Sequence, residues 1–117
     1  MSTTTTKFLC LFRFPAGATS KPSSPEEMQA QYAAWTAWMK KFEKELTPGG
    51  PLKREGGGSA VVRGGAVTDG PYIEAKEVIA SYSIIETSSL ARAIEIIKET
   101  PLSTDPNYSV EIREMGY

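Results

Sequence analysis

The fold depends on one stretch in the middle of the chain, Val67-Thr68-Asp69-Gly70-Pro71-Tyr72-Ile73-Glu74-Ala75-Lys76-Glu77. Pro71 fixes its own φ and removes a backbone donor, while Gly70 permits backbone angles that other residues resist. Asp69 can accept hydrogen bonds from nearby backbone amides as an Asx turn. The stretch is therefore predicted to be a stiff corner, and it leads into the most apolar strand candidate, Val78–Glu86.

A hairpin is predicted immediately before this corner. Gly64 and Gly65 separate the apolar runs 60–63 and 66–68. Two consecutive glycines supply the positive φ angles that two-residue hairpin turns require.

The first predicted strand, Lys7–Phe14, is rich in aromatic residues. Both of its faces are apolar, so both are expected to be covered, as in a central strand. Arg13 is the exception, and its charge indicates that the face it shares with Leu9 and Leu11 lies nearer a polar cleft. Cys10 lies among phenylalanines, and we interpret it as a small buried hydrophobe and not as a nucleophile.

The first helix begins at Ser24 as N-cap, with Pro25 at the first position and Glu27 closing a capping box. We expect about 22 residues, ending at Thr47–Pro51 before a loose segment, Leu52–Ser59. An apolar stripe on this helix is predicted to face the core; its members are Met28, Tyr32, Trp35, Met39, Phe42 and Leu46. Trp38 lies off the stripe and is expected in a subunit contact or a pocket wall.

The last third of the chain contains a short helix and a closing strand. The predicted helical stripe is Leu90, Ala93, Ile94 and Ile97. In the strand Ser109–Met115, Val110 and Ile112 are expected to face inward, and Glu111, Arg113 and Met115 to face the other way.

The order strand, helix, hairpin and strand, helix, strand corresponds to a β-α-β-β-α-β plan. It predicts an α+β, ferredoxin-like fold: an antiparallel sheet with both helices on one face, formed by a single domain, 7–117, after a disordered polar lead, 1–6. The other face carries Leu9, Leu11, Arg13, Glu111 and Arg113, too apolar for water and too charged for a core. We therefore predict a homodimer built sheet against sheet, with a charged cleft between the copies. Whether Tyr82 or Ser83 faces that cleft is left open.

Composition excludes several classes of function. Thirteen basic and fourteen acidic residues give a net charge of −1, so nucleic acid is not an expected partner. There is no histidine, which excludes His-based catalysis and His metal sites, and neither a cofactor nor a metal is predicted. No apolar run is long enough to cross a bilayer, and a single cysteine favours the cytoplasm.

The corner Asp69-Gly70-Pro71-Tyr72 resembles the Asp-Gly-Pro-Phe signature of the YCII-related, or DGPF-domain, family. The run through Glu74, Lys76 and Glu77 into Tyr82–Glu86 is similar to the family's following segment, and Ser24–Met28 resembles a typical helix start of its members. The resemblance covers about residues 7–115 and implies the dimeric α/β-barrel form of the fold. Most members have no established activity. A sub-branch carries a His/Asp pair suggested to be catalytic, of which only Asp69 is available here.

These observations predict a small homodimeric protein that binds a small, anionic ligand in the interface cleft. The expected ligand-binding residues are Arg13, Tyr72, Lys76, Tyr82 and Arg113. A first alternative is an isomerase- or lyase-type enzyme with Asp69 as acid/base, although we favour the interpretation that Asp69 caps a turn. A second alternative, implied by relatives encoded beside alternative sigma factors, is a regulatory accessory protein.

Overall fold

The computed structural model describes residues 5–15, 24–52, 58–69 and 77–116. The elements are β1 (Thr6–Pro15), α1 (Pro25–Lys41), β2 (Leu46–Pro51), β3 (Ala60–Arg63), β4 (Ala66–Asp69), β5 (Glu77–Thr87), α2 (Leu90–Lys98) and β6 (Ser109–Glu114). Neither of the helices described is long and apolar enough to span a membrane.

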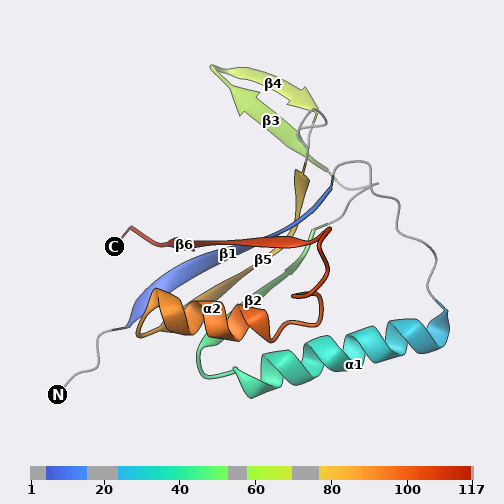
Figure 1. Cartoon of the computed structure of the whole chain (residues 1–117). Coiled ribbons are helices and arrows are strands. Elements are labelled where there is room, and N and C mark those ends of the chain that lie inside the picture. Colours follow the sequence, from blue (N-terminus) through green and yellow to red (C-terminus); the bar gives the residue numbers. More distant parts are fainter. Residues whose placement is uncertain (1–4, 16–23, 53–57, 70–76, 117) are drawn as a thin grey trace.

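Four strands form one antiparallel sheet in the order β2-β5-β1-β6. Both helices lie on the same side of this sheet (Figure 1). The predicted α+β, ferredoxin-like fold is therefore confirmed. The hairpin β3–β4 has positive φ at Gly64 (56°) and Gly65 (83°), as predicted. It forms a sheet of its own and projects away from the body of the molecule (Figure 1).

The central strand β1 separates the two sides of the sheet. Phe8, Cys10 and Phe12 are buried beneath the helices, at 3%, 0% and 3% exposure. The intervening residues, Leu9 and Leu11, are half-buried on the other face. The predicted division of β1 into two apolar faces is confirmed, and the strand begins one residue earlier than expected, at Thr6.

Helix α1 begins as predicted, because the Ser24 hydroxyl accepts a hydrogen bond from the Glu27 amide. The predicted stripe is wrong for its N-terminal half: Met28 is 60% exposed and Tyr32 is 75% exposed. The buried residue of this helix is Trp38, which the stripe left out. The misjudged face has a physical reason: the N-terminal half of α1 is exposed on all sides from Pro25 to Ala34, so no core selects a buried stripe there.

The strand β2 was missed, because its sequence carries two prolines and two glycines where helix and loop were expected. Leu46, assigned to the helical stripe, is instead the buried first residue of β2. Pro48 and Pro51 are tolerated because β2 is an edge strand, where a lost backbone donor need not break a ladder. In the predicted order, the hairpin supplied the second strand of the sheet. In the structure β2 takes that place, and the hairpin lies outside the main sheet.

The short helix α2 is correctly located, but only two of the four residues predicted to face the core are buried. Ala93, Ile96 and Ile97 are buried, whereas Leu90 and Ile94 are 50% and 38% exposed. The prediction omitted Ile96, which is buried, and included two residues on the more exposed side of the helix.

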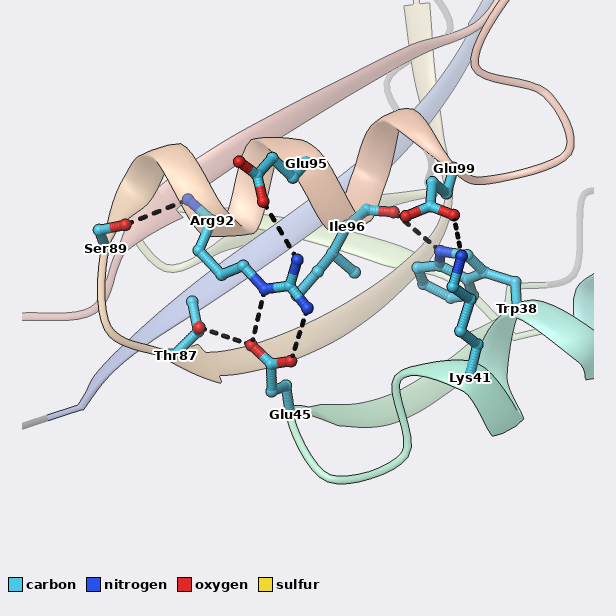
Figure 2. Close-up of polar contacts among 9 residues, drawn as sticks. All are labelled: Trp38, Lys41, Glu45, Thr87, Ser89, Arg92, Glu95, Ile96 and Glu99. Atoms are coloured by element: carbon cyan, nitrogen blue, oxygen red, sulfur yellow. Dashed lines mark hydrogen bonds and ion pairs between the residues drawn. The ribbon is translucent and has the colours of Figure 1, made fainter. Parts of the chain in front are cut away.

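Polar contacts connect α2 to the region around the end of α1 (Figure 2). The indole Nε1 of Trp38 donates to the Ile96 carbonyl at 2.9 Å, and Lys41 forms an ion pair with Glu99. After the helix, Glu45 accepts two hydrogen bonds from the Arg92 guanidinium, at 3.1 and 3.3 Å.

Glu45 is the centre of a small network. The Thr87 hydroxyl donates to its second oxygen at 2.6 Å, and Arg92 also pairs with Glu95 on its own helix at 3.1 Å. The hydrogen bonds from Arg92, and then from Thr87, hold the pKa of Glu45 below its usual value. The turn between α1 and β2 is thereby tied to α2 and to the end of β5.

Trp38→Phe removes the indole donor, while the Ile96 carbonyl keeps the hydrogen bond from the Glu99 amide, at 3.2 Å. We expect the free energy of unfolding to fall by about 1 kcal/mol for the lost hydrogen bond, and further for the packing lost with the smaller ring. Urea denaturation measures this loss. Trp35→Phe, a matched control at a half-buried position, should cost less, and an equal loss in the two variants would contradict the assigned role of the indole donor.

Glu45→Gln should lower stability at pH 7 by about 1 kcal/mol, since the carboxylate is partly exposed. The pKa of Glu45 is lower in the folded than in the unfolded chain. Its contribution is therefore present above the ordinary value of 4.5 and is lost as the pH falls through the folded pKa. The difference between variant and parent should shrink between pH 7 and pH 3 in thermal unfolding. Glu95→Gln, at a more exposed partner of Arg92, is the control and should show a smaller change with pH.

Candidate functional site: the uncovered sheet face and an aromatic pocket

Cross-strand register identifies the residues on the sheet face away from the helices. Leu11 pairs with Tyr82 on one side and with Glu111 on the other. Residues opposite each other in a sheet share a face. Tyr82 therefore lies on this uncovered face, whereas Ser83, opposite Cys10, is buried at 3% exposure under the helices. Of the two residues that the sequence left open, Tyr82 is the one on the sheet face that was predicted to form the cleft.

Two arginines on the uncovered face converge on one carboxylate. Arg13 Nη1 lies 2.5 Å from Glu111 Oε1, and Arg113 Nη1 lies 3.4 Å from Glu111 Oε2. The hydrogen bond from Arg13 is the main reason that the pKa of Glu111 is lowered. The arginines predicted to bind an anionic ligand are thus engaged by a carboxylate of the same chain.

The structure brings three of the six predicted site residues, Arg13, Tyr82 and Arg113, onto one face. The backbone of Asp69 closes β4 opposite Ala60, and its side chain lies outside the described residues. Tyr72 and Lys76 also lie outside the described part of the chain. Their predicted roles stay predictions.

A pocket of about 390 Å³ lies between α1 and the strands β2 and β5. Its walls are mostly apolar and aromatic, and they consist of Phe12, Tyr32, Trp35, Trp38, Met39, Pro48–Pro51 and Ser81–Ser83. The sequence analysis missed this aromatic pocket as a site. The signal was present in the aromatic spacing of α1, but we interpreted it as a core stripe. Trp38, expected in a subunit contact or a pocket wall, does line the pocket.

The aromatic walls are held in place by contacts with one another. Trp35 packs edge-to-face on Trp38, with ring centroids 5.8 Å apart, and on Phe12, at 6.1 Å. Each such pair contributes about 0.5–1.5 kcal/mol beyond its burial. Because Trp38 is also fixed by its bond to Ile96, the wall that it forms with Trp35 is rigid.

Tyr82 borders both regions, since it lies on the uncovered face and also lines the aromatic pocket. A Cβ atom on Gly49 would lie 2.3 Å from the Tyr82 ring, closer than any side chain allows. Glycine at position 49 therefore lets the ring of Tyr82 lie directly against the backbone of β2.

The strand side of the pocket contains few polar groups. The Ser83 hydroxyl forms no hydrogen bond of ordinary geometry with the described residues. Burial raises the pKa of its neighbour, the Cys10 thiol, to about 11, against a smaller lowering by Ser83. The thiol is therefore protonated at neutral pH, which agrees with its interpretation as a buried hydrophobe.

A second hollow, of about 640 Å³, lies where the N-terminal end of β1 meets the ends of β5 and β6. It is larger, but its lining includes the ion-paired side chains of Lys7 and Glu86 and a single large apolar residue, Met115. Small-molecule sites are usually apolar concavities with a few polar groups. The aromatic pocket fits this description better, and we take it as the candidate site.

Comparison with known proteins identifies the family. The family model described as the YCII-related domain matches residues 7–115. No curated protein matches the chain. Among solved structures, the chain is similar to 5-chloro-2-hydroxyhydroquinone dehydrochlorinase (TftG) from Burkholderia phenoliruptrix AC1100, in complex with 2,5-dihydroxybenzoquinone. The TM-score is 0.56 at 18% identity, over 95% of this chain and 94% of the other, which supports the fold. The match of the family model over nearly the whole sequence shows that this chain belongs to the YCII-related family.

Proposed function

We propose that this YCII-related protein binds a small molecule with a flat, apolar ring in the aromatic pocket between α1 and the sheet. The observation that carries the proposal is the wall formed by Tyr32, Trp35 and Trp38 opposite the glycines and prolines of β2. Rings stack well on aromatic side chains, and a concave apolar site buries most of a small ligand.

The chemistry of the walls favours an uncharged ligand over the anionic one predicted from the sequence. An ion placed against these walls would lose its hydration without gaining a counter-charge there. Arg13 and Arg113, the expected anion ligands, already contact Glu111. The structural neighbour TftG was solved with 2,5-dihydroxybenzoquinone, whose flat ring has a comparable shape but whose acidic hydroxyls are ionised at neutral pH. The acid/base role of Asp69 and the accessory role beside a sigma factor stay predictions.

The tryptophans offer a direct measurement, because the chain contains two of them and both line the pocket. We expect the uncharged compounds hydroquinone and phenol to change tryptophan fluorescence and to raise the apparent Tm, with cyclohexanol as the non-aromatic control. Tyr32→Ala should weaken binding about two- to tenfold.

Met28→Ala is the matched control for Tyr32→Ala. Both residues are exposed on the same helix, and only Tyr32 lines the pocket. Equal affinities in the two variants, or no saturable response to any of the aromatic compounds, would contradict the proposed function.

We further propose that two copies pack through the uncovered sheet face. Leu9, Leu11 and Ile84 are half-buried there although neither of the two described helices covers them. Pairing two such faces would bury these apolar rows and enclose the charges of Arg13, Glu111 and Arg113. Tyr82 would then lie close to both the interface and the aromatic pocket.

Leu11→Lys places a charge at the centre of the uncovered face. We expect it to raise the dissociation constant of this contact about tenfold or more, because the ammonium would be desolvated. Light scattering measures the loss. Leu90→Lys, on the exposed side of α2, is the control and should leave the mass unchanged.

A further inference from the structure

The side-chain hydroxyls that line the aromatic pocket differ in how far a ligand can reach them. Ser83 is buried at 3% exposure, Tyr32 is 75% exposed on the outer half of α1, and Tyr82 lies on the uncovered face. Ser81 is half-buried and lines the pocket. A polar group that orients a ligand in an apolar pocket must be within its reach and fixed in place. Ser81 meets the first requirement.

The register of the sheet places Ser81 on the pocket side. Ser81 lies opposite Phe12 in the ladder between β1 and β5, so the two side chains share the face beneath the helices. The Phe12 ring is buried and contacts Trp35, with ring centroids 6.1 Å apart. Ser81 is therefore the cross-strand neighbour of the ring that supports the tryptophan wall.

Tyr108 fixes the Ser81 hydroxyl, which is the second requirement. The Tyr108 ring packs on Phe12, with ring centroids 6.0 Å apart, and on Phe14, at 4.6 Å. Burial raises the pKa of Tyr108 to about 12, and a hydrogen bond with the Ser81 side chain opposes part of this rise. The phenol of Tyr108 is therefore neutral at pH 7, and with Ser81 it forms a pair of hydroxyls beside the pocket.

One hydrogen bond between these two hydroxyls leaves part of the capacity of Ser81 unused. A serine hydroxyl has one donor and two acceptor sites. If Tyr108 donates, the Ser81 proton and one lone pair remain, and if Ser81 donates, both of its lone pairs remain. A ligand hydroxyl fits both arrangements, because it donates as well as accepts. A ring carbonyl fits only the first arrangement, and a methyl group fits neither.

We propose that Ser81 is the specificity-determining residue of the aromatic pocket, where its hydroxyl binds a hydroxyl group on the ring of the ligand. Tyr108 is the positioning residue that holds the Ser81 hydroxyl. The ligand class is then an uncharged phenol. This inference rests on the proposed function, since it requires that an aromatic ring binds in the pocket. A ring with a methyl group in place of the hydroxyl leaves Ser81 unpaired on that side, so the site discriminates against it.

Phenol and toluene test the role of Ser81, because they carry a hydroxyl and a methyl group on the same ring. Titrations followed by tryptophan fluorescence give the dissociation constant of each compound for the parent and the variants. We expect Ser81→Ala to weaken the binding of phenol about three- to tenfold and not to weaken that of toluene. Ser88→Ala is the matched control: Ser88 is exposed just after β5 and does not line the pocket, so both parent values should be kept.

Tyr108→Phe tests the positioning role. It removes the phenolic hydroxyl and keeps the ring that packs on Phe12 and Phe14, and circular dichroism checks that the variant is folded. We expect phenol to bind about twofold more weakly and toluene to bind as in the parent. An equal change for the two compounds would show that Tyr108 acts on packing alone and would contradict its positioning role.

The two compounds also separate this inference from the proposed function. If neither phenol nor toluene binds the parent, the proposed function fails and the inference fails with it. If both bind and Ser81→Ala keeps the parent ratio of their dissociation constants, aromatic binding stands and the role of Ser81 is overturned.

Discussion

The alternation of side chains along β1 is the constraint on which the rest of the structure depends. Phe8, Cys10 and Phe12 fill the space beneath the helices, and a strand that buries these three must turn Leu9, Leu11 and Arg13 to the other side. A shift of the register by one residue would exchange the two sets. The position of Arg13, its pairing with Glu111 and the apolar character of the uncovered face all follow from this one choice.

The second organising feature is the attachment of α1 by its C-terminal half. Trp38 and Phe42 are buried, whereas the first ten residues of the helix are exposed. Attachment at one end fixes the direction of the helix and holds Trp35 and Trp38 against the core, but it leaves Tyr32, nearer the N-terminal end, exposed. The aromatic pocket is the space that this arrangement leaves, and its rigid wall is the part closest to the anchoring bond between Trp38 and Ile96.

Sequence patterns predicted the features whose signals are local. The Ser24 cap, the Gly64-Gly65 hairpin and the alternation of β1 and β6 each depend on a few neighbouring residues, and all are present. The errors arose where contacts between residues far apart in the sequence determine which side chains are buried. Periodicity along α1 favoured Tyr32, but burial there depends on how far the sheet extends, which no helical pattern reports.

The candidate site was predictable only in part for the same reason. Arg13, Tyr82 and Arg113 share a face because they lie in three strands whose register a single sequence does not specify. The aromatic pocket was harder to predict, since one of its walls is the strand β2. The composition of that strand, with two prolines and two glycines in six residues, is typical of a loop.

The unusual composition of β2 has two consequences that belong together. Glycine and proline present no large side chain to α1, so the space opposite Trp35 and Met39 stays open, and Gly49 lets the Tyr82 ring lie against the backbone. The same prolines deprive the β2 edge of donors, so that a further strand cannot form a regular ladder there. A strand rich in valine or isoleucine would pair more strongly and would fill the hollow with its own side chains. The pocket and the closed edge are thus two results of one short segment.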